Sequence, residues 1–415
     1  MVHSPWSMLL LCSALLALRK PWALHTPQFW AEDGEIFMKQ DDAWGAGAFL
    51  TPYNGYLHLL PRLIAWIASH TADVAWWPAI YNWSAFAISV ALFARMASPR
   101  VELPAKPWLM LALVLVVGTG EVLLNVTNLQ WFAAFFLVLH LFTARPTTLG
   151  QRLGDLLILL VIGLNGPFAI VFAPLFAWRA WRAASPRTTD QGPETKDPKT
   201  QWLNVWLEPL AVGACAVVQG WLVTHTNAPL SLHEGPEKFR LGMMLSVIGS
   251  RLITWPVFGP AAVKAWPLWA HAILGSGVIG ALVIWALRAD PRRAVRAPLV
   301  VAFTLITVAC AYRSRADTWQ DDNLVNGDRY FYISRVLVAW LVILECDARP
   351  RAVRYAARAV CVVAILMHAP RFILAAPPDY KWAEHCDPIR RGVPANIYTL
   401  PEGWWIEYPG RPPKK

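Results

Sequence analysis

Three carboxylate side chains stand close together directly after the first apolar segment. Glu32, Asp33 and Glu35 lie within FWAEDGEIF, residues 29–37, whose apolar members would hold the acids near the lipid headgroups. One carboxylate of the Glu32 and Asp33 pair can bind a divalent cation (Mg or Mn) or a sugar hydroxyl, while the other acts as a general base. A plain turn is the alternative interpretation, because Asp-Gly is a common turn dipeptide.

Two basic side chains follow in an amphipathic segment, residues 52–63. His58 and Arg62 are spaced i and i+4, so they share the more polar face of a predicted interfacial helix. Together they could hold a phosphate of a lipid headgroup. Solvated side chains without a ligand are the alternative.

Polar residues also interrupt the apolar sequence farther along the chain. Asn128 and Gln130 belong to a connection, residues 121–131, that contains no Lys or Arg, and Asn165 precedes a Gly-Pro break. Such a break suits a bent connection beside a cavity, or equally a plain hairpin turn. We treat all three side chains as candidate substrate-binding residues.

The segment 312–332 mixes Arg, Asp and aromatic residues. Asp328, Arg329 and Tyr330 stand at its end, where a membrane span is predicted to begin. Arg329 could pair with a lipid phosphate while the neighbouring rings face acyl chains or a sugar. A surface ion pair within an aromatic belt is the alternative.

The composition is that of a membrane protein. Hydrophobic residues make up 56% of the chain, charged residues only 15%, and the mean hydropathy is +0.38. The net charge of +10 comes mainly from Lys and Arg in short loops between apolar runs. This pattern indicates membrane orientation and contact with anionic lipids, and argues against nucleic-acid binding.

The apolar runs predict an all-α, polytopic protein with about eleven transmembrane helices and interfacial helices in the first external loop. Residues 241–258 are apolar but include Arg251, so we predict an interfacial or re-entrant helix there. The predicted spans are residues 5–24, 74–94, 107–124, 129–144, 153–165, a sixth beginning near 168, 205–224, 266–287, 297–312, 330–347 and 356–373.

These spans divide the chain into a membrane domain, residues 1–376, and a short external tail, residues 377–415. The external loop 25–73 of the membrane domain carries the acidic motif. The strongly basic loops fall on one side, which the positive-inside rule makes cytoplasmic. The acidic motif therefore falls on the external face, where any chemistry would have no access to cytoplasmic nucleotides.

The order of these features resembles the GT-C superfamily of polytopic glycosyltransferases, which use polyprenyl-phosphate sugars on the outer face of the membrane. The similarity extends over most of the chain but rests on short motifs like those of bacterial members. These are FWAEDG (29–34), NVTNLQW (125–131), NGP (165–167) and GDRYF (327–331).

The resemblance implies that Asp33 or Glu32 serves as general base or metal ligand for an acceptor hydroxyl. A polyprenyl-phosphate leaving group also needs a cation, for which Arg329, Arg62 and His58 are candidates. We therefore expect a glycosyltransferase of the bacterial inner membrane that moves a sugar to a glycan or lipid acceptor. The alternatives are a flippase or transporter of a lipid-linked saccharide and, third, a scaffold in envelope assembly.

Overall fold

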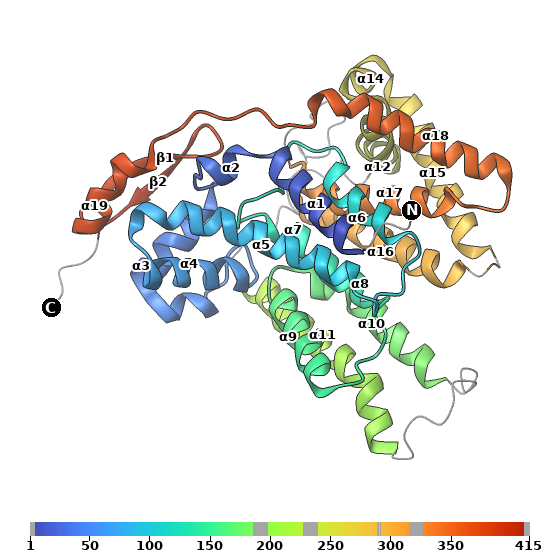
Figure 1. The fold of residues 1–415 in the computed structure, drawn as a ribbon, viewed down its shortest axis with the longest axis horizontal. Helices are drawn as coiled ribbons and strands as arrows, with labels where there is room; N and C mark the ends of the chain where they lie inside the picture. The colour runs from blue at the N-terminus through green and yellow to red at the C-terminus, as the bar shows by residue number, and fades with distance from the viewer. Residues whose placement is uncertain are drawn as a thin grey trace.

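The structure is a computed structural model that describes residues 5–185, 198–226, 240–288, 290, 292–314 and 327–410, without the side chains of residues 198–204 and 287. Most of the described chain is helical, as predicted (Figure 1). The all-α prediction is wrong at the C-terminus, where two short strands form a hairpin. Most of the segment 312–332 lies outside the described residues. The same is true of residues 179–199, whose basic and proline-containing sequence predicts a loop.

Six helices in the described ranges are long and apolar enough to cross a membrane. The chain is therefore a membrane-embedded helical protein, but with fewer such helices than the number predicted. The six are Val74–Ala97, Val205–His225, Leu241–Phe258, Leu268–Ala286, Arg293–Arg313 and Arg351–Arg371.

The count is lower because several predicted spans are short or interrupted helices. Residues 107–124 form α6 (Lys106–Leu115) followed by irregular chain, and residues 129–144 are divided into α7 (Leu129–Ala133) and α8 (Phe135–His140). A helix of about ten residues covers only about half of the hydrocarbon core. Other predicted spans correspond to the short helices α1 (Pro5–Arg19), α9 (Leu149–Gly163), α10 (Phe168–Ala184) and α17 (Arg329–Glu345).

Residues 241–258, predicted to be interfacial or re-entrant, form a continuous helix of spanning length. It consists of α12 (Leu241–Ile248), the π-helical turn η7 (Gly249–Thr254) and α13 (Trp255–Phe258). The helix packs closely against α15 (Leu268–Leu287). A Cβ atom added to Gly249 would lie 1.9 Å from the carbonyl oxygen of His271, so the two backbones approach as only glycine allows.

This contact predicts that Gly249→Ala destabilises the protein. The added methyl group would overlap a backbone oxygen that cannot rotate away, and overpacking of this kind costs about 1–3 kcal/mol. We expect the melting temperature in detergent to fall by several degrees. Gly277→Ala on α15 is the matched control, because nothing lies within 4 Å of a Cβ there. Equal melting temperatures for the two variants would contradict the described packing.

Helices α5 (Trp77–Ala97) and α17 connect the parts of the membrane domain. Helix α5 packs against α1, α6, α7 and α8, whereas α17 packs against α6, α7 and η7 as well as two helices near the C-terminal end of the membrane domain. Trp340 of α17 is fully buried, and its indole donates to the carbonyl of Leu109 on α6 at 2.9 Å. The remaining helices are α2 (Trp22–His25), η1 (Asp33–Met38), α3 (Lys39–Trp44), η2 (Gly45–Leu50), α4 (Leu59–Thr71), η3 (Val74–Trp76), α11 (Pro198–His225), α14 (Pro260–Ala265), α16 (Arg293–Arg313), α18 (Arg351–His368), η9 (Ala369–Arg371), η10 (Trp382–His385) and α19 (Cys386–Arg391).

The C-terminal tail lies on the acidic motif. Strands β1 (Ala395–Thr399) and β2 (Trp404–Tyr408) pair antiparallel, and the residue that follows β1, Leu400, donates its N–H to the carbonyl of Phe29 at 3.1 Å. Figure 1 shows this hairpin at the same end of the molecule as α3 and α4. The tail thus fixes the backbone that leads into the acids.

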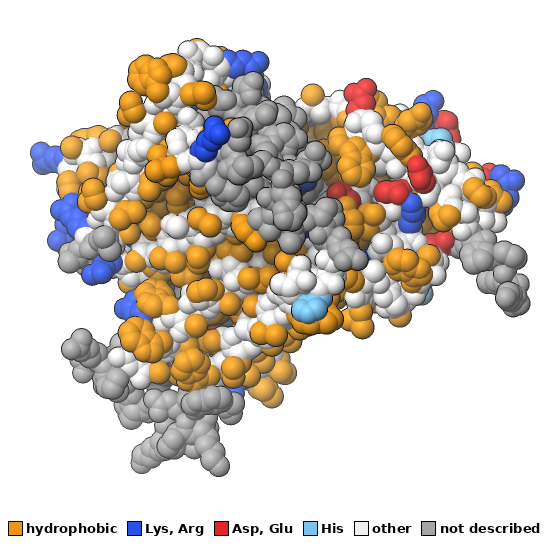
Figure 2. Space-filling view, turned by 180° about the vertical axis from the view of Figure 1, so that it is seen from behind, with side chains coloured by type: hydrophobic (Ala, Val, Ile, Leu, Met, Phe, Trp, Pro, Cys, Tyr) orange, Lys and Arg blue, Asp and Glu red, His pale blue; other side chains and the backbone are white. Residues whose placement is uncertain are grey.

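Charge is distributed unevenly between the two ends of the molecule. In Figure 2 most of the visible Lys and Arg side chains lie toward the end away from the C-terminus, and most of the visible acids lie toward the C-terminal end. Apolar side chains cover much of the surface between the two ends (Figure 2). Helices α15 and α18 also carry exposed apolar residues, such as Ile284 and Leu366. This distribution suits a membrane protein whose two ends meet different aqueous phases.

Candidate active site

Asp33 is fully buried at the start of η1. Its carboxylate accepts hydrogen bonds from both the backbone N–H and the hydroxyl of Thr127, each at 2.7 Å. The N–H groups of Trp30 and Val126 donate to its second oxygen at 3.3 and 3.4 Å. Both oxygens of Asp33 therefore hold the segment that follows α6.

This segment, residues 116–128, is irregular chain inside a helical domain, where unpaired backbone groups are costly. Three basic side chains bind its carbonyl groups and that of the preceding turn. Arg19 donates to Val114 and Val116, Lys20 to Gly120 and Leu123, and Arg335 to Val117. These contacts account for the two basic residues, Arg19 and Lys20, near the end of α1.

Asp328 also binds this segment. Its carboxylate accepts from the N–H of Thr119 at 2.8 Å and from the Thr119 hydroxyl at 3.2 Å. It also forms an ion pair with Arg335, and both side chains are almost completely buried. Asp328, proposed as a substrate-binding residue, is thus engaged with the chain itself.

Glu32 differs from Asp33 because it is only partly buried. The Tyr53 hydroxyl donates to its carboxylate at 3.3 Å. Glu32 also lies close enough to Arg329 for their charges to interact. The structure therefore brings a residue of the acidic motif near the arginine that begins α17.

Arg329 forms an ion pair with Glu121, and its backbone N–H donates to the same carboxylate at 3.1 Å. Its side chain is 35% exposed and is thus accessible from outside the protein. The neighbouring Tyr330 ring meets the Trp131 ring edge-on, with centroids 5.2 Å apart. Glu32, Glu121, Arg329 and Tyr53 together are called the acid–arginine site below.

His58 lies among the rings of Phe37, Tyr53 and Tyr56, at centroid distances of 5.4, 5.7 and 4.7 Å. Burial, and to a lesser extent the nearby Arg62 charge, lower the pKa of His58 to about 3. The ring is therefore neutral at physiological pH and does not supply the positive charge that phosphate binding needs.

Arg62, the second basic candidate in this segment, is also buried. It is 1% exposed and donates to the side-chain oxygen of Gln40 at 2.8 Å. Its guanidinium lies over the Phe37 ring at 5.6 Å. Of the three cationic candidates, Arg329 is the one whose side chain is substantially exposed.

The three side-chain amides predicted to bind substrate stabilise irregular turns between helices. Asn128 donates to the carbonyl of Glu121 at 3.1 Å, and Asn165 accepts from the N–H of Leu60 at 3.3 Å. Gln130 is buried against Gly166, and a Cβ atom added to Gly166 would overlap the amide oxygen of Gln130. These three side chains therefore shape the turns around the site.

Sequence reasoning missed the roles of Glu121 and Gln219. Gln219 is fully buried within a spanning helix and bonds both backbone groups of Leu57 as well as the carbonyl of Gly166. A lone glutamine in an otherwise apolar run is a signal that could have identified it. Glu121 carries no comparable local signal, because its partner is distant in sequence.

One group of possible metal ligands exists among the described residues: His140, Asp155 and Glu208. Its acids are already paired with arginines: Asp155 with Arg95 at 2.8 Å and Arg100 at 2.5 Å, and Glu208 with Arg179 at 2.8 Å. These positive charges oppose a divalent cation. At the predicted metal site, Asp33 uses both oxygens in hydrogen bonds, so Glu32 alone is a poor fit for Mg or Mn.

The burial of Asp33 predicts an unusual pH dependence. Burial raises its pKa to about 7, although hydrogen bonds from Thr127 act in the opposite direction. Between the unfolded value of 3.8 and about 7, the folded protein holds a proton that the unfolded chain lacks. The resulting stability is present at low pH and is lost as pH rises toward 7.

Asp33→Asn removes this titration while retaining an acceptor for Thr127. We expect the melting temperature of the wild type to fall, relative to this variant, as pH is raised from about 5 to about 8. Thermal unfolding in detergent at several pH values measures the difference. Parallel pH curves for the two proteins would show that Asp33 is not the buried titrating acid.

In comparisons with known proteins, no family model, no curated protein and no solved structure matches the chain.

Proposed function

We propose that the protein is a membrane glycosyltransferase that moves a sugar from a polyprenyl-phosphate donor to a glycan or lipid acceptor. The observation that carries the proposal is the acid–arginine site, in which partly exposed Glu32 and Arg329, distant in sequence, lie within electrostatic range of each other. Glycosyl transfer from a lipid phosphate needs both groups, a carboxylate to accept the hydroxyl proton and a cation beside the leaving phosphate.

In the proposed reaction the acceptor hydroxyl attacks the anomeric carbon while the bond from that carbon to the phosphate oxygen breaks. The hydroxyl proton passes to Glu32, and the lipid phosphate leaves against Arg329. The Tyr53 hydroxyl orients Glu32, and Glu121 orients Arg329.

The sequence left Glu32 and Asp33 as alternatives for the base. Partial exposure favours Glu32 as the base. Asp33 is fully buried and its oxygens already accept hydrogen bonds, so we assign it a positioning role. Because the residues fit a divalent cation poorly, the mechanism includes no metal step.

A bacterial inner membrane with the acid–arginine site on the external face is part of the proposal. The separation of basic and acidic side chains between the two ends supports this orientation (Figure 2). A membrane-embedded protein such as this one can bind a donor whose isoprenoid tail lies in the bilayer.

Transport of a lipid-linked saccharide is the second candidate, because charged residues do lie deep in the helices. Arg251 and Arg335 are 0% and 2% exposed within η7 and α17. Buried charges often mark transport pathways. Arg335, however, is engaged by Val117, Arg251 and Asp328, which accounts for it structurally.

An assay of sugar transfer by the purified protein in liposomes distinguishes glycosyl transfer from transport. Polyprenyl phosphates carrying labelled glucose, mannose or arabinose are supplied with an envelope glycan and lipid extract. Glycosyl transfer predicts label in the acceptor and release of sugar-free polyprenyl phosphate. Movement of intact donor across the bilayer without a new glycosidic bond would overturn the proposal.

A further inference from the structure

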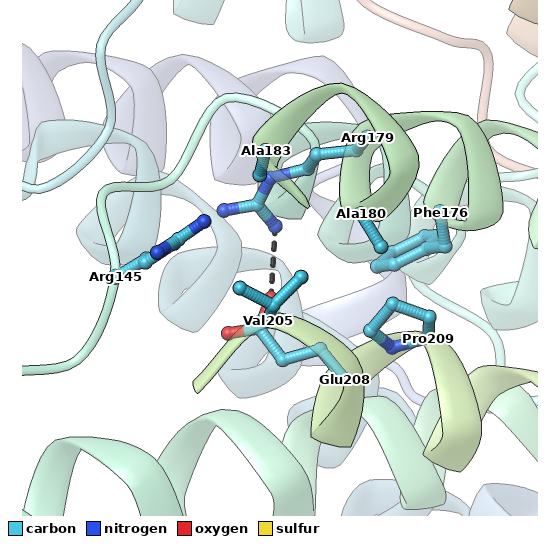
Figure 3. A pocket seen from close by; sticks show the side chains of 8 residues that line it. All are labelled: Arg145, Phe176, Arg179, Ala180, Ala183, Val205, Glu208 and Pro209. Carbon is cyan, nitrogen blue, oxygen red and sulfur yellow. Dashed lines mark hydrogen bonds and ion pairs between the residues drawn. The ribbon is translucent and has the colours of Figure 1, made fainter. Parts of the chain in front are cut away.

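A small pocket lies far from the acid–arginine site in sequence, between α10 and α11. It has a volume of about 60 Å³. Two arginines, Arg145 and Arg179, and Glu208 supply its charged groups, while Phe176, Val205 and Pro209 form apolar parts of its wall (Figure 3). This cavity is called the Arg145 pocket.

Arg145 is exposed and makes no hydrogen bond or ion pair with any described residue. Figure 3 shows its side chain extending toward the guanidinium of Arg179. Arg179 already donates to Glu208 at 2.8 Å and to the carbonyl of Thr143 at 2.6 Å. Two like charges that point toward each other are stabilised by an anion between them.

The charge balance next to the pocket also favours an anion. Arg95, Arg100 and Arg179 are paired with only two carboxylates, Asp155 and Glu208, which leaves one positive charge in excess. Arg145, which is unpaired among the described residues, raises the excess to two. The same balance that makes this cluster a poor cation site makes it a good anion site.

We propose that the Arg145 pocket binds the phosphate of an anionic membrane lipid between Arg145 and Arg179. Arginine pairs well with phosphate, and basic pockets between transmembrane helices hold lipid headgroups. The apolar wall suits the glycerol and upper acyl chains. Helix α11 leaves most of its apolar surface open to lipid, with Leu210 53% exposed beside the pocket residue Pro209. The inference does not depend on the proposed glycosyl transfer.

The test measures binding of dioleoyl phosphatidylglycerol to the full-length protein in detergent, by native mass spectrometry and by thermal shift. Dioleoyl phosphatidylcholine, a zwitterionic lipid without net charge, serves as the comparison. We expect phosphatidylglycerol to bind more tightly and to raise the melting temperature. Arg145→Ala should weaken this binding about tenfold, and Arg145→Lys should retain part of it.

Arg351→Ala is the matched control, because Arg351 is an exposed arginine at the start of another spanning helix, α18. It should leave phosphatidylglycerol binding unchanged. Equal binding of the two lipids, or equal losses in the Arg145 and Arg351 variants, would overturn the proposal. Stabilisation by inorganic phosphate alone, with no added effect of lipid, would identify a free anion as the ligand and overturn the lipid assignment.

Discussion

Glu32→Gln is expected to lower glycosyl transfer at least about 100-fold, because general-base catalysis contributes about 10²- to 10⁴-fold to a rate. The amide has nearly the same shape and can still accept a hydrogen bond from Tyr53, but it cannot take a proton from the acceptor hydroxyl. Since Glu32 is only partly buried, the variant should fold normally.

The measurement is the initial rate of label transfer in liposomes at matched protein amounts. Glu402→Gln is the control, since Glu402 is an exposed acid in the same C-terminal hairpin region that covers the acidic motif. It should transfer sugar at the wild-type rate. Full activity of Glu32→Gln would remove Glu32 as the base and return Asp33 to consideration.

Arg335→Met is expected to lower the free energy of unfolding by about 3–5 kcal/mol, the usual cost of leaving one partner of a buried ion pair uncompensated. The substitution strands the carboxylate of Asp328, and it also removes a donor from the carbonyl of Val117. The segment 116–128 carries Glu121, so activity should fall together with stability.

The double variant Asp328→Asn/Arg335→Met should recover part of the lost stability, because no buried charge is then left unpaired. Arg358→Met is the control. Its partner Asp347 is 73% exposed, so this ion pair should contribute about 1 kcal/mol or less. The measurement is the melting temperature, in one detergent, of the wild type, Arg335→Met, the double variant and Arg358→Met. Equal effects of the Arg335 and Arg358 substitutions would contradict the structural role of the buried pair.

The membrane class of the chain follows directly from composition, but the number of spans does not. Residues 107–124 are apolar enough to suggest a continuous helix, yet the helix ends at Leu115. The irregular chain that follows is possible because Arg19, Lys20 and Arg335 satisfy its carbonyl groups. Hydropathy cannot detect such partners, since they come from distant parts of the sequence.

The candidate site was predictable only in part, because its contacts also come from distant parts of the sequence. Local sequence indicates that Glu32, Asp33 and Arg329 are unusual for their apolar surroundings. It does not distinguish a partly exposed Glu32 from a buried Asp33, because Thr127 and the C-terminal hairpin determine that difference through tertiary contacts. Strand pairing in the tail was likewise missed, because it depends on docking against the acidic motif.

The most direct test of the central claim is a structure of the protein with a polyprenyl phosphate bound. The proposed function predicts that the lipid phosphate lies within hydrogen-bond distance of the Arg329 guanidinium, with Glu32 beside the position of the sugar. A carrier phosphate bound elsewhere, with Arg329 and Glu32 in contact only with protein, would contradict it.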